Sequence, residues 1–168
     1  DVLIMTATPI PRTLAITLYG DLDVSIINEL PPGRLPVKTI LFGQRQERLE
    51  AYKLAKKELK CARQVYIVYP VIEESYAMDI SGAKKMYADL KAGEFEDFRL
   101  GLIHGRLKQE EQDKVMSEFK SAKIDILIST TVLEVGIDIP NATCMLIEHA
   151  ERFGLSQLHQ LRGRVGRG

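Results

Sequence analysis

Residues 100–129 read LGLIHGRLKQEEQDKVMSEFKSAKIDILIS and contain a strand, a helix and a second strand. Leu100–Ile103 is a short apolar strand. Gln109–Lys120 places apolar residues at helical spacing among charged ones, which is typical of an amphipathic helix. Ile124–Ser129 is an apolar strand of the kind that parallel sheets bury on both faces. Two strands joined by a helix in this way predict a parallel α/β sheet.

The alternation of strands and helices extends to both sides of this unit. Ser81 and Ser156 each stand where a helix would begin, so we expect them to be N-caps. One sheet with helices on its faces is therefore the predicted fold class. The further predicted elements are strand Val37–Phe42, helix Gln44–Lys60, strand Val65–Tyr69, helix Ser81–Lys91, strand Cys144–Ile147 and a last helix through Leu161.

The first part of the chain predicts two short strands, Val2–Met5 and Val24–Asn28, with a short helix from Pro11 to Gly20 between them. Leu30–Pro36 then holds three prolines and a glycine, so it predicts a stiff, extended linker.

We place a domain boundary at this linker, between residues 1–36 and residues 37–168. Neither end of the chain has the character of a natural polar tail, so we expect the chain to be a piece of a longer protein.

Composition limits the class of protein. The 168 residues hold 23 Lys and Arg against 23 Asp and Glu, so the formal net charge is zero. This balance excludes a histone-like polycation, but a nucleic-acid partner needs only a local basic face. With 45% hydrophobic residues, the chain can bury a core.

No apolar run approaches the roughly 20 residues that span a bilayer, so no membrane partner is expected. Cys61 and Cys144 lie far apart, with no second cysteine near either. This spacing indicates neither a disulfide framework nor a zinc site, and a cytoplasmic location fits it best. We predict no metal site within these residues.

The last twelve residues, QLHQLRGRVGRG, alternate arginine with glycine. Arg162, Arg164 and Arg167 present planar guanidinium groups that suit phosphate, and the glycines allow close approach to a ligand. The helix before them would aim the arginines from a rigid element. A flexible, solvated basic tail is the alternative reading of the same residues.

Hydroxyl residues follow the strand that ends at Ser129. Ligands of open parallel sheets bind beyond the carboxyl ends of the strands, where Thr130 and Thr131 suit phosphate contacts. Gly136 and Asp138 come next, and a carboxylate beside a glycine turn suits a ribose hydroxyl. Alternatively, Thr130 only caps a helix and Asp138 only belongs to a turn.

Two further candidates stand at predicted strand ends. His104 and Gly105 follow one strand, and Thr6 and Thr8 follow the first. A histidine in a structural role and a threonine turn are the alternatives.

Three signatures are missing from the sequence. It holds no Gly-x-x-x-x-Gly-Lys-Ser/Thr phosphate loop, no Asp-Glu pair after a strand to hold magnesium, and no Gly-x-Gly-x-x-Gly turn. The sequence therefore does not favour an autonomous nucleotidase or a dehydrogenase.

In their order and spacing, four motifs resemble the later motifs of superfamily 2 helicases. They are Thr-Ala-Thr-Pro at 6–9, His-Gly at 104–105, Thr-Thr…Gly-x-Asp at 130–138 and Gln-x-x-Gly-Arg-x-Gly-Arg at 160–167. Longer strings are similar to those of bacterial branch-migration helicases: TATPIPRTL at 6–14, YPVIEES at 69–75, LEVGIDIPN at 133–141 and RFGLSQLHQLRGRVGR at 152–167. The transcription-repair coupling factors share much of this pattern.

The resemblance implies a RecA-like parallel sheet flanked by helices. Residues 37–168 would be the second RecA-like domain of the motor, truncated at its C-terminus, and residues 1–36 the end of the first domain with the interdomain linker. ATP and Mg²⁺ would bind in the full-length protein. The phosphate loop and the metal ligands would lie outside this chain, which would be inactive alone.

The resemblance also implies residue roles. Gln160, Arg164 and Arg167 would act on ATP as catalytic residues, and Gly136 and Asp138 would help to bind it. The DNA backbone would contact Thr130, Thr131, His104 and Gly105, whereas Thr6 and Thr8 would couple hydrolysis to domain movement. Many relatives carry arginine where this chain has Leu161, so Arg162 is left with no firm role.

The implied partners are branched or forked DNA, such as stalled forks and Holliday junctions, and the first RecA-like domain of the same chain. The full-length protein would be a monomer acting in DNA recombination and repair. A coupling-factor helicase domain and a non-catalytic nucleic-acid-binding module are the alternatives.

Overall fold

The computed structural model describes residues 25, 36–43, 45–70, 76–130 and 139–166. The predicted strands and helix of residues 2–28 and the linker at 30–36 lie outside the described residues, except for positions 25 and 36. The domain boundary therefore stays a prediction.

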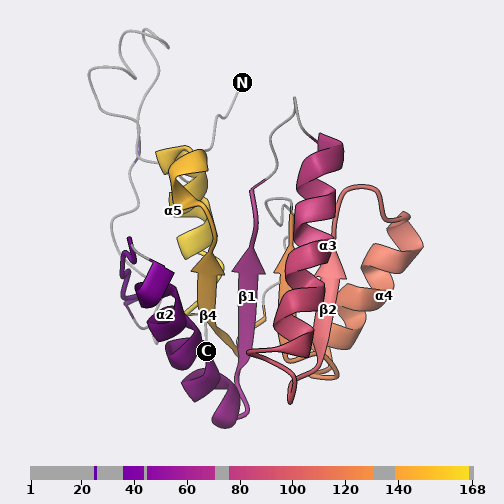
Figure 1. Ribbon diagram of the computed structural model, residues 1–168, viewed down its shortest axis with the longest axis horizontal. Coiled ribbons are helices and arrows are strands. Elements are labelled where there is room, and N and C mark those ends of the chain that lie inside the picture. The colour runs from indigo at the N-terminus through magenta and orange to yellow at the C-terminus, as the bar shows by residue number, and fades with distance from the viewer. Residues whose placement is uncertain (1–24, 26–35, 44, 71–75, 131–138, 167–168) are drawn as a thin grey trace, which may run out of the picture.

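The described strands form one parallel sheet. Its order is β2-β3-β1-β4, where β1 is Gln64–Val68, β2 is Leu100–Ile103, β3 is Ile126–Ser129 and β4 is Ala142–Ile147. All three neighbouring pairs run parallel, so the carboxyl ends of the strands share one edge of the sheet (Figure 1). The predicted parallel α/β fold is confirmed.

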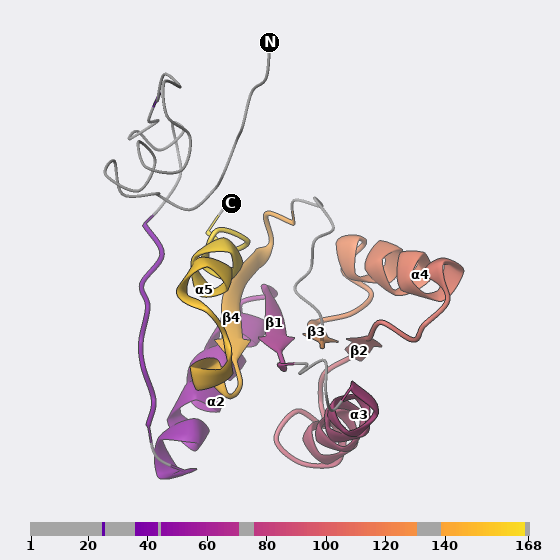
Figure 2. The ribbon, with the colours of Figure 1, turned by 90° about the horizontal axis from the view of Figure 1, so that it is seen from above.

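Helices cover both faces of this sheet. Figure 2 shows α2 and α3 on one face and α4 and α5 on the other. Their bounds are Arg45–Lys60 for α2, Tyr76–Ala92 for α3, Gln109–Lys120 for α4 and Leu155–Arg162 for α5, with a 3-10 turn at Ala150–Arg152. The helices that connect parallel strands must return over a face of the sheet, and this produces the three layers.

Alternating strand residues supply the two halves of the core. In β1, Val65 and Ile67 pack with α2 and α3, whereas Tyr66 between them packs with α4. Every residue of β1 and of β3 is buried. These two strands are the centre of the sheet, which explains why their sequences are apolar at nearly every position.

The structure corrects three expectations about elements. Residues 37–42 are not a strand, and Leu41 is 86% exposed, because no described strand pairs with them. Ser81 lies inside α3, because the apolar helical spacing already includes Ile80 in the turn before it. Ser156 lies inside α5, whose N-cap is Gly154.

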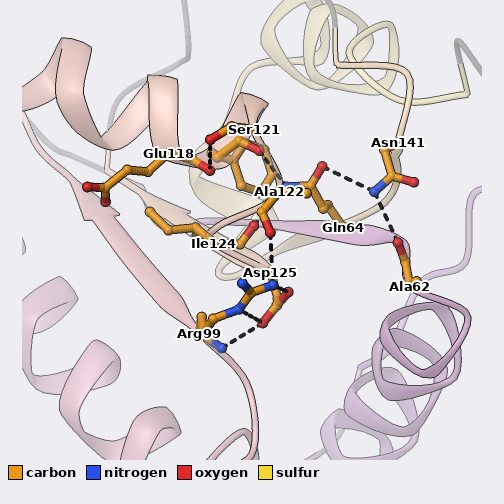
Figure 3. A network of polar contacts seen from close by, with 10 residues as sticks. Ala62, Gln64, Arg99, Glu118, Ser121, Ala122, Ile124, Asp125 and Asn141 are labelled. Carbon is orange, nitrogen blue, oxygen red and sulfur yellow. Dashed lines mark hydrogen bonds and ion pairs between the residues drawn. The ribbon is translucent and has the colours of Figure 1, made fainter.

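The amino ends of the strands are tied together by a buried amide, Gln64 (Figure 3). Its Nε2 donates to the carbonyl of Phe119 at 2.6 Å and to that of Ile124 at 2.7 Å. Its Oε1 accepts from Asn141 Nδ2 at 3.3 Å. One side chain thus joins β1 to the end of α4 and to the segment that enters β4, at the edge opposite the candidate site.

Candidate functional site

The carboxyl edge of the sheet gathers residues that directly follow the strands. Tyr69 follows β1, His104 follows β2, Thr130 follows β3 and Glu148 follows β4. The hydrogen-bonding ladder continues into this row, because Thr130 N donates to Ile103 O at 3.1 Å and Glu148 N donates to Val68 O at 2.9 Å. The row is therefore held as firmly as the strands that precede it.

His104 and Thr130 are the buried polar residues of this row, with exposed fractions of 5% and 3%. His104 Nδ1 and Thr130 Oγ1 have no hydrogen-bond partner among the residues that the structure describes. A buried polar atom left without a partner costs about 1–3 kcal/mol, so such atoms are rare unless they serve a ligand. Two of them on adjacent strands therefore indicate a binding site.

These two side chains belong to the same face of the sheet. Leu102 and Ile128 pack in the cluster under α2 and α3, and Ile103, between Leu102 and His104, packs under α4. Since side chains alternate between faces, His104 and Thr130 are placed toward α3. The register of β2 and β3, which pairs Ile103 with Ser129, makes the two residues neighbours across the strands.

The pKa of His104 is held below its ordinary value, first by burial and then by the positive charges of Lys84 and Arg106. A hydrogen bond of the ring to its own backbone and, less strongly, the charge of Glu111 act in the opposite direction. The imidazole is therefore neutral at physiological pH and has one N–H to donate. Gly105 is exposed directly beside it, in a turn that Leu107 N closes on His104 O at 3.0 Å.

A second polar group surrounds Glu148, which the sequence analysis did not single out. Its Oε1 accepts from Tyr52 Oη at 3.0 Å and lies 3.0 Å from Arg48 Nη2, so α2 is tied to the end of β4. His149 follows with φ 51°, a left-handed conformation that histidine adopts more often than most residues other than glycine. The signal available in the sequence was the pair of ionisable residues, Glu148 and His149, directly after an apolar strand. A similar position directly after a strand singled out His104.

The arginine motif begins on α5, as expected. Gln160 and Arg162 are exposed, and Arg162 Nη2 donates to Val37 O at 3.4 Å. Arg164 is half-buried in the turn after the helix, between the buried side chains of Leu161 and Val165. These two anchors fix the backbone on either side of Arg164, so the reading of the motif as a flexible, solvated tail is wrong up to residue 166.

The structure does not merge the two groups of candidates into one site. His104 and Thr130 follow β2 and β3, whereas α5 lies beside β4, at the other side of the sheet (Figure 2). Separate ligands for the two groups are therefore the simplest interpretation. The remaining candidates, Thr6, Thr8, Thr131, Gly136, Asp138 and Arg167, lie outside the described residues.

Two features are absent from the part of the chain that the structure describes. No cluster of three or more His, Cys, Asp or Glu side chains there could hold a metal ion. None of the described helices combines the length and the apolar character of a membrane span.

The sequence matches the model of the helicase conserved C-terminal domain over residues 51–168. It is 55% identical over 168 residues, all of this chain, to the ATP-dependent DNA helicase RecG of Thermotoga maritima, of which it covers 21%. It is 56% identical over 167 residues, or 99% of the chain, to RecG of Synechocystis, of which it covers 20%. The chain thus spans about a fifth of the length of these curated relatives.

Solved structures agree with the sequence comparison. A structure of RecG bound to a three-way DNA junction matches 100% of this chain and 21% of its own, with a TM-score of 0.77 and 53% identity. Domain 2 of the DEAD-box helicase Mss116p, bound to an RNA duplex, matches 73% of this chain and 44% of its own, with a TM-score of 0.52 and 22% identity. The second likeness shows the fold alone, which is RecA-like.

Proposed function

Because the chain belongs to the family of the helicase conserved C-terminal domain, we propose that it is the second motor domain of an ATP-dependent DNA helicase that remodels branched DNA. One observation carries the proposal. The whole chain is 55% identical to a RecG helicase, and its arginine motif stands on a helix anchored in the core. The relative whose structure contains a three-way DNA junction supports forks and junctions as the substrate class.

We assign residues 37–168 to this second domain and residues 1–36 to the end of the first domain and the linker. ATP binds between the two RecA-like domains, and the cleft closes on binding and opens after hydrolysis. Thr6 and Thr8 couple these movements to hydrolysis. The protein acts as a monomer in the bacterial cytoplasm, at the nucleoid, in recombination and repair.

The donors on α5 and in the sequence that follows it fit a nucleoside triphosphate. Gln160 offers an amide, and Arg164 and Arg167 offer guanidinium groups whose planar forks bind phosphoryl oxygens at two points. The arginines offset charge that develops on the phosphoryl group, and Gly136 and Asp138 contribute to nucleotide binding. The resemblance to superfamily 2 helicases implies that the Mg²⁺ ligands lie in the full-length protein, outside this chain.

The other group of candidates fits a DNA backbone. Donors to phosphate oxygens come from Thr130, Thr131, His104 and the exposed backbone of Gly105. These contacts are to the backbone of DNA and not to base edges. Their grip is therefore independent of sequence and weakens as salt is added. Successive release and renewal of this grip, driven by closure of the cleft, moves the motor along one strand.

Arginine substitutions in the full-length helicase test the first assignment. We expect Arg164→Ala or Arg167→Ala to lower DNA-stimulated ATP turnover by about 10³-fold or more, the size of effect that arginine fingers have in GTPases. Fork-DNA binding should remain close to wild type. The measurement is steady-state ATPase with saturating fork DNA, together with anisotropy of labelled fork DNA.

Arg63→Ala is the matched control. Arg63 is exposed at the amino edge of the sheet, where it pairs with Glu58 at 2.9 Å, so its loss should leave ATP turnover unchanged. Normal turnover in both motif variants would contradict the catalytic role. Loss of fork binding with normal turnover would instead favour a non-catalytic DNA-binding module.

A further inference from the structure

We propose that Lys84 and Arg106 form, together with His104 and Thr130, a cradle for one phosphate group of the DNA backbone. This phosphate cradle lies beyond the carboxyl ends of β2 and β3. The inference rests on the proposed function and adds to it two positively charged residues that the helicase motifs do not include.

The floor of the phosphate cradle consists of two hydrogen-bond donors. Thr130 Oγ1 and the ring of His104 are buried on adjacent strands, and neither Thr130 Oγ1 nor His104 Nδ1 has a partner among the described residues. A neutral imidazole N–H and a hydroxyl both donate to an anion. Neighbouring parallel strands lie about 4.8 Å apart, a spacing that two oxygens of one phosphate group can bridge.

Lys84 reaches the phosphate cradle from α3. Tyr87 Oη of the same helix donates to Leu100 O at 3.4 Å, so this side of α3 faces β2. Helix α3 runs back from the carboxyl to the amino ends of the strands, so Lys84, one turn before Tyr87, lies nearer to the end of β2. The positive charge of Lys84 lowers the pKa of His104, in agreement with this placement.

Arg106 belongs to the turn that follows His104 and is exposed. Its charge also acts on His104, in the same sense as that of Lys84. Two cations beside two donors select an anion and exclude a metal cation. A guanidinium group can bind a phosphate at two points, whereas an ammonium group contributes a mobile point charge.

The cradle should bind any sequence equally, because each of its contacts is to phosphate. Each phosphate contact of a single strand contributes about 0.7 to the slope of log Kobs against log salt concentration. Removal of one cation should therefore flatten this slope by about that amount. A flatter slope with the same loss of affinity for every sequence is the signature of a backbone contact.

Lys84→Gln and Arg106→Gln in the full-length helicase test the cradle against a matched control, Lys85→Gln. Lys85 is the next residue of α3 but lines the groove of about 800 Å³ between α2 and α3. The probe is a labelled oligothymidylate, titrated at several salt concentrations by fluorescence anisotropy. We expect Lys84→Gln and Arg106→Gln, but not Lys85→Gln, to weaken binding and flatten the slope.

Thr130→Val provides a second test that does not depend on charge. The substitution keeps the shape of the side chain and removes a hydroxyl that has no described partner, so the folded chain should lose no stability. Oligothymidylate binding should weaken at every salt concentration. A lower thermal midpoint for Thr130→Val would overturn the cradle, because it would show that the hydroxyl is satisfied within the protein.

The outcomes separate this inference from the proposed function. If the wild-type helicase binds oligothymidylate but Lys84→Gln and Arg106→Gln behave like Lys85→Gln, the cradle is wrong and the helicase assignment stands. If the wild-type protein binds no DNA at any salt concentration, both are wrong. Equal flattening by all three substitutions would indicate general electrostatic attraction and would also overturn the cradle.

Discussion

The side chain of His104 shows how a polar residue at the end of an apolar strand acquires special properties. The strand carries it into the edge of the core, where burial and two nearby cations disfavour its protonated form. A histidine in an ordinary structural role would have a buried partner for each ring nitrogen. His104 Nδ1 has none among the described residues, which favours the ligand-binding reading over the structural one.

This lowered pKa predicts a pH dependence of stability. The folded chain resists protonation of His104, whereas the unfolded chain takes up a proton near the ordinary pKa of 6.5. The stabilisation is therefore complete above pH 6.5 and is lost as the pH falls toward the folded pKa. Urea unfolding of the chain at a series of pH values should show this decline, and His104→Leu should reduce it.

The ion pair of Asp125 does not confuse the result, because the pKa of Asp125 is lowered and lies in a lower pH window. Asp125 has a pKa below its ordinary value of 3.8, opposed by burial but lowered by its contacts with Arg99. Its contribution is lost only as the pH falls below that range. An equally steep decline between pH 6.5 and 5 in His104→Leu would contradict the assignment to His104.

At the scale of elements, α3 and α4 differ in what fixes them. Helix α4 has a buried polar tie at its carboxyl end, because Gln64 donates to the carbonyls of Phe119 and Ile124. Helix α3 is held mainly by apolar residues, with the exposed Lys84 and Lys85 directed to different sides. Helix α4 is thus tied to the sheet by hydrogen bonds, whereas α3 presents positive charge at the carboxyl edge of the sheet.

Gln64→Leu tests the buried tie. The substitution keeps roughly the volume of the side chain but leaves a buried carbonyl without its donor, so it should destabilise the chain by about 1–3 kcal/mol. The measurement is the free energy of unfolding from urea denaturation. Gln109→Leu is the control, because Gln109 is exposed and bonds only to the exposed Asp113 among its described contacts, and it should change stability by less than about 0.5 kcal/mol.

Equal destabilisation by the two leucine substitutions would contradict a special role for Gln64. The change in the free energy of unfolding would then come from the introduced leucine or from the loss of any polar side chain, and not from the hydrogen bonds of Gln64. The tie lies at the amino edge of the sheet, far from the phosphate cradle, so Gln64→Leu should leave the salt dependence of DNA binding unchanged in protein that remains folded.

At the scale of the whole molecule, charged residues are used differently at the two edges of the sheet, although the net charge is zero. At the amino edge, charged side chains form ion pairs within the chain. For example, Arg99 Nη2 lies 2.5 Å from Asp125 Oδ1. The carboxyl edge carries Lys84 and Arg106 beside neutral donors, and Arg164 follows α5. We therefore propose two anion-binding regions, one for DNA phosphate and one for ATP.

We predict that the 168 residues alone do not hydrolyse ATP. The sequence holds no phosphate loop, so we expect hydrolysis to need the first RecA-like domain. The check is ATP turnover by the purified chain with and without fork DNA, against the full-length helicase as positive control. Turnover that co-purifies with the chain and disappears in Arg164→Ala would refute the two-domain interpretation.

The sequence by itself determined the fold class and the bounds of two elements, whereas the predicted bounds of the central strands β1 and β3 differ from the structure by one or two residues. Leu100–Ile103 and Gln109–Lys120 were predicted to the residue, because local apolar periodicity follows from which faces are buried. The motif order along the chain also indicated the helicase family, which the comparisons confirm. Helix starts were less predictable. Ser81 has a good capping side chain, but α3 already includes the buried Ile80 before it. Helix α5 begins one residue before Ser156, at the exposed Leu155, with Gly154 as its N-cap.

Only the tertiary structure decided which strand ends become a site. Residues 37–42 have strand-like sequence but pair with no described strand, since pairing depends on a neighbour and not on local pattern. Lys84 was invisible in the sequence because it is one lysine among many on exposed helix faces. The role that we propose for it depends on the packing of α3 across β2, which brings together segments that are distant in the sequence.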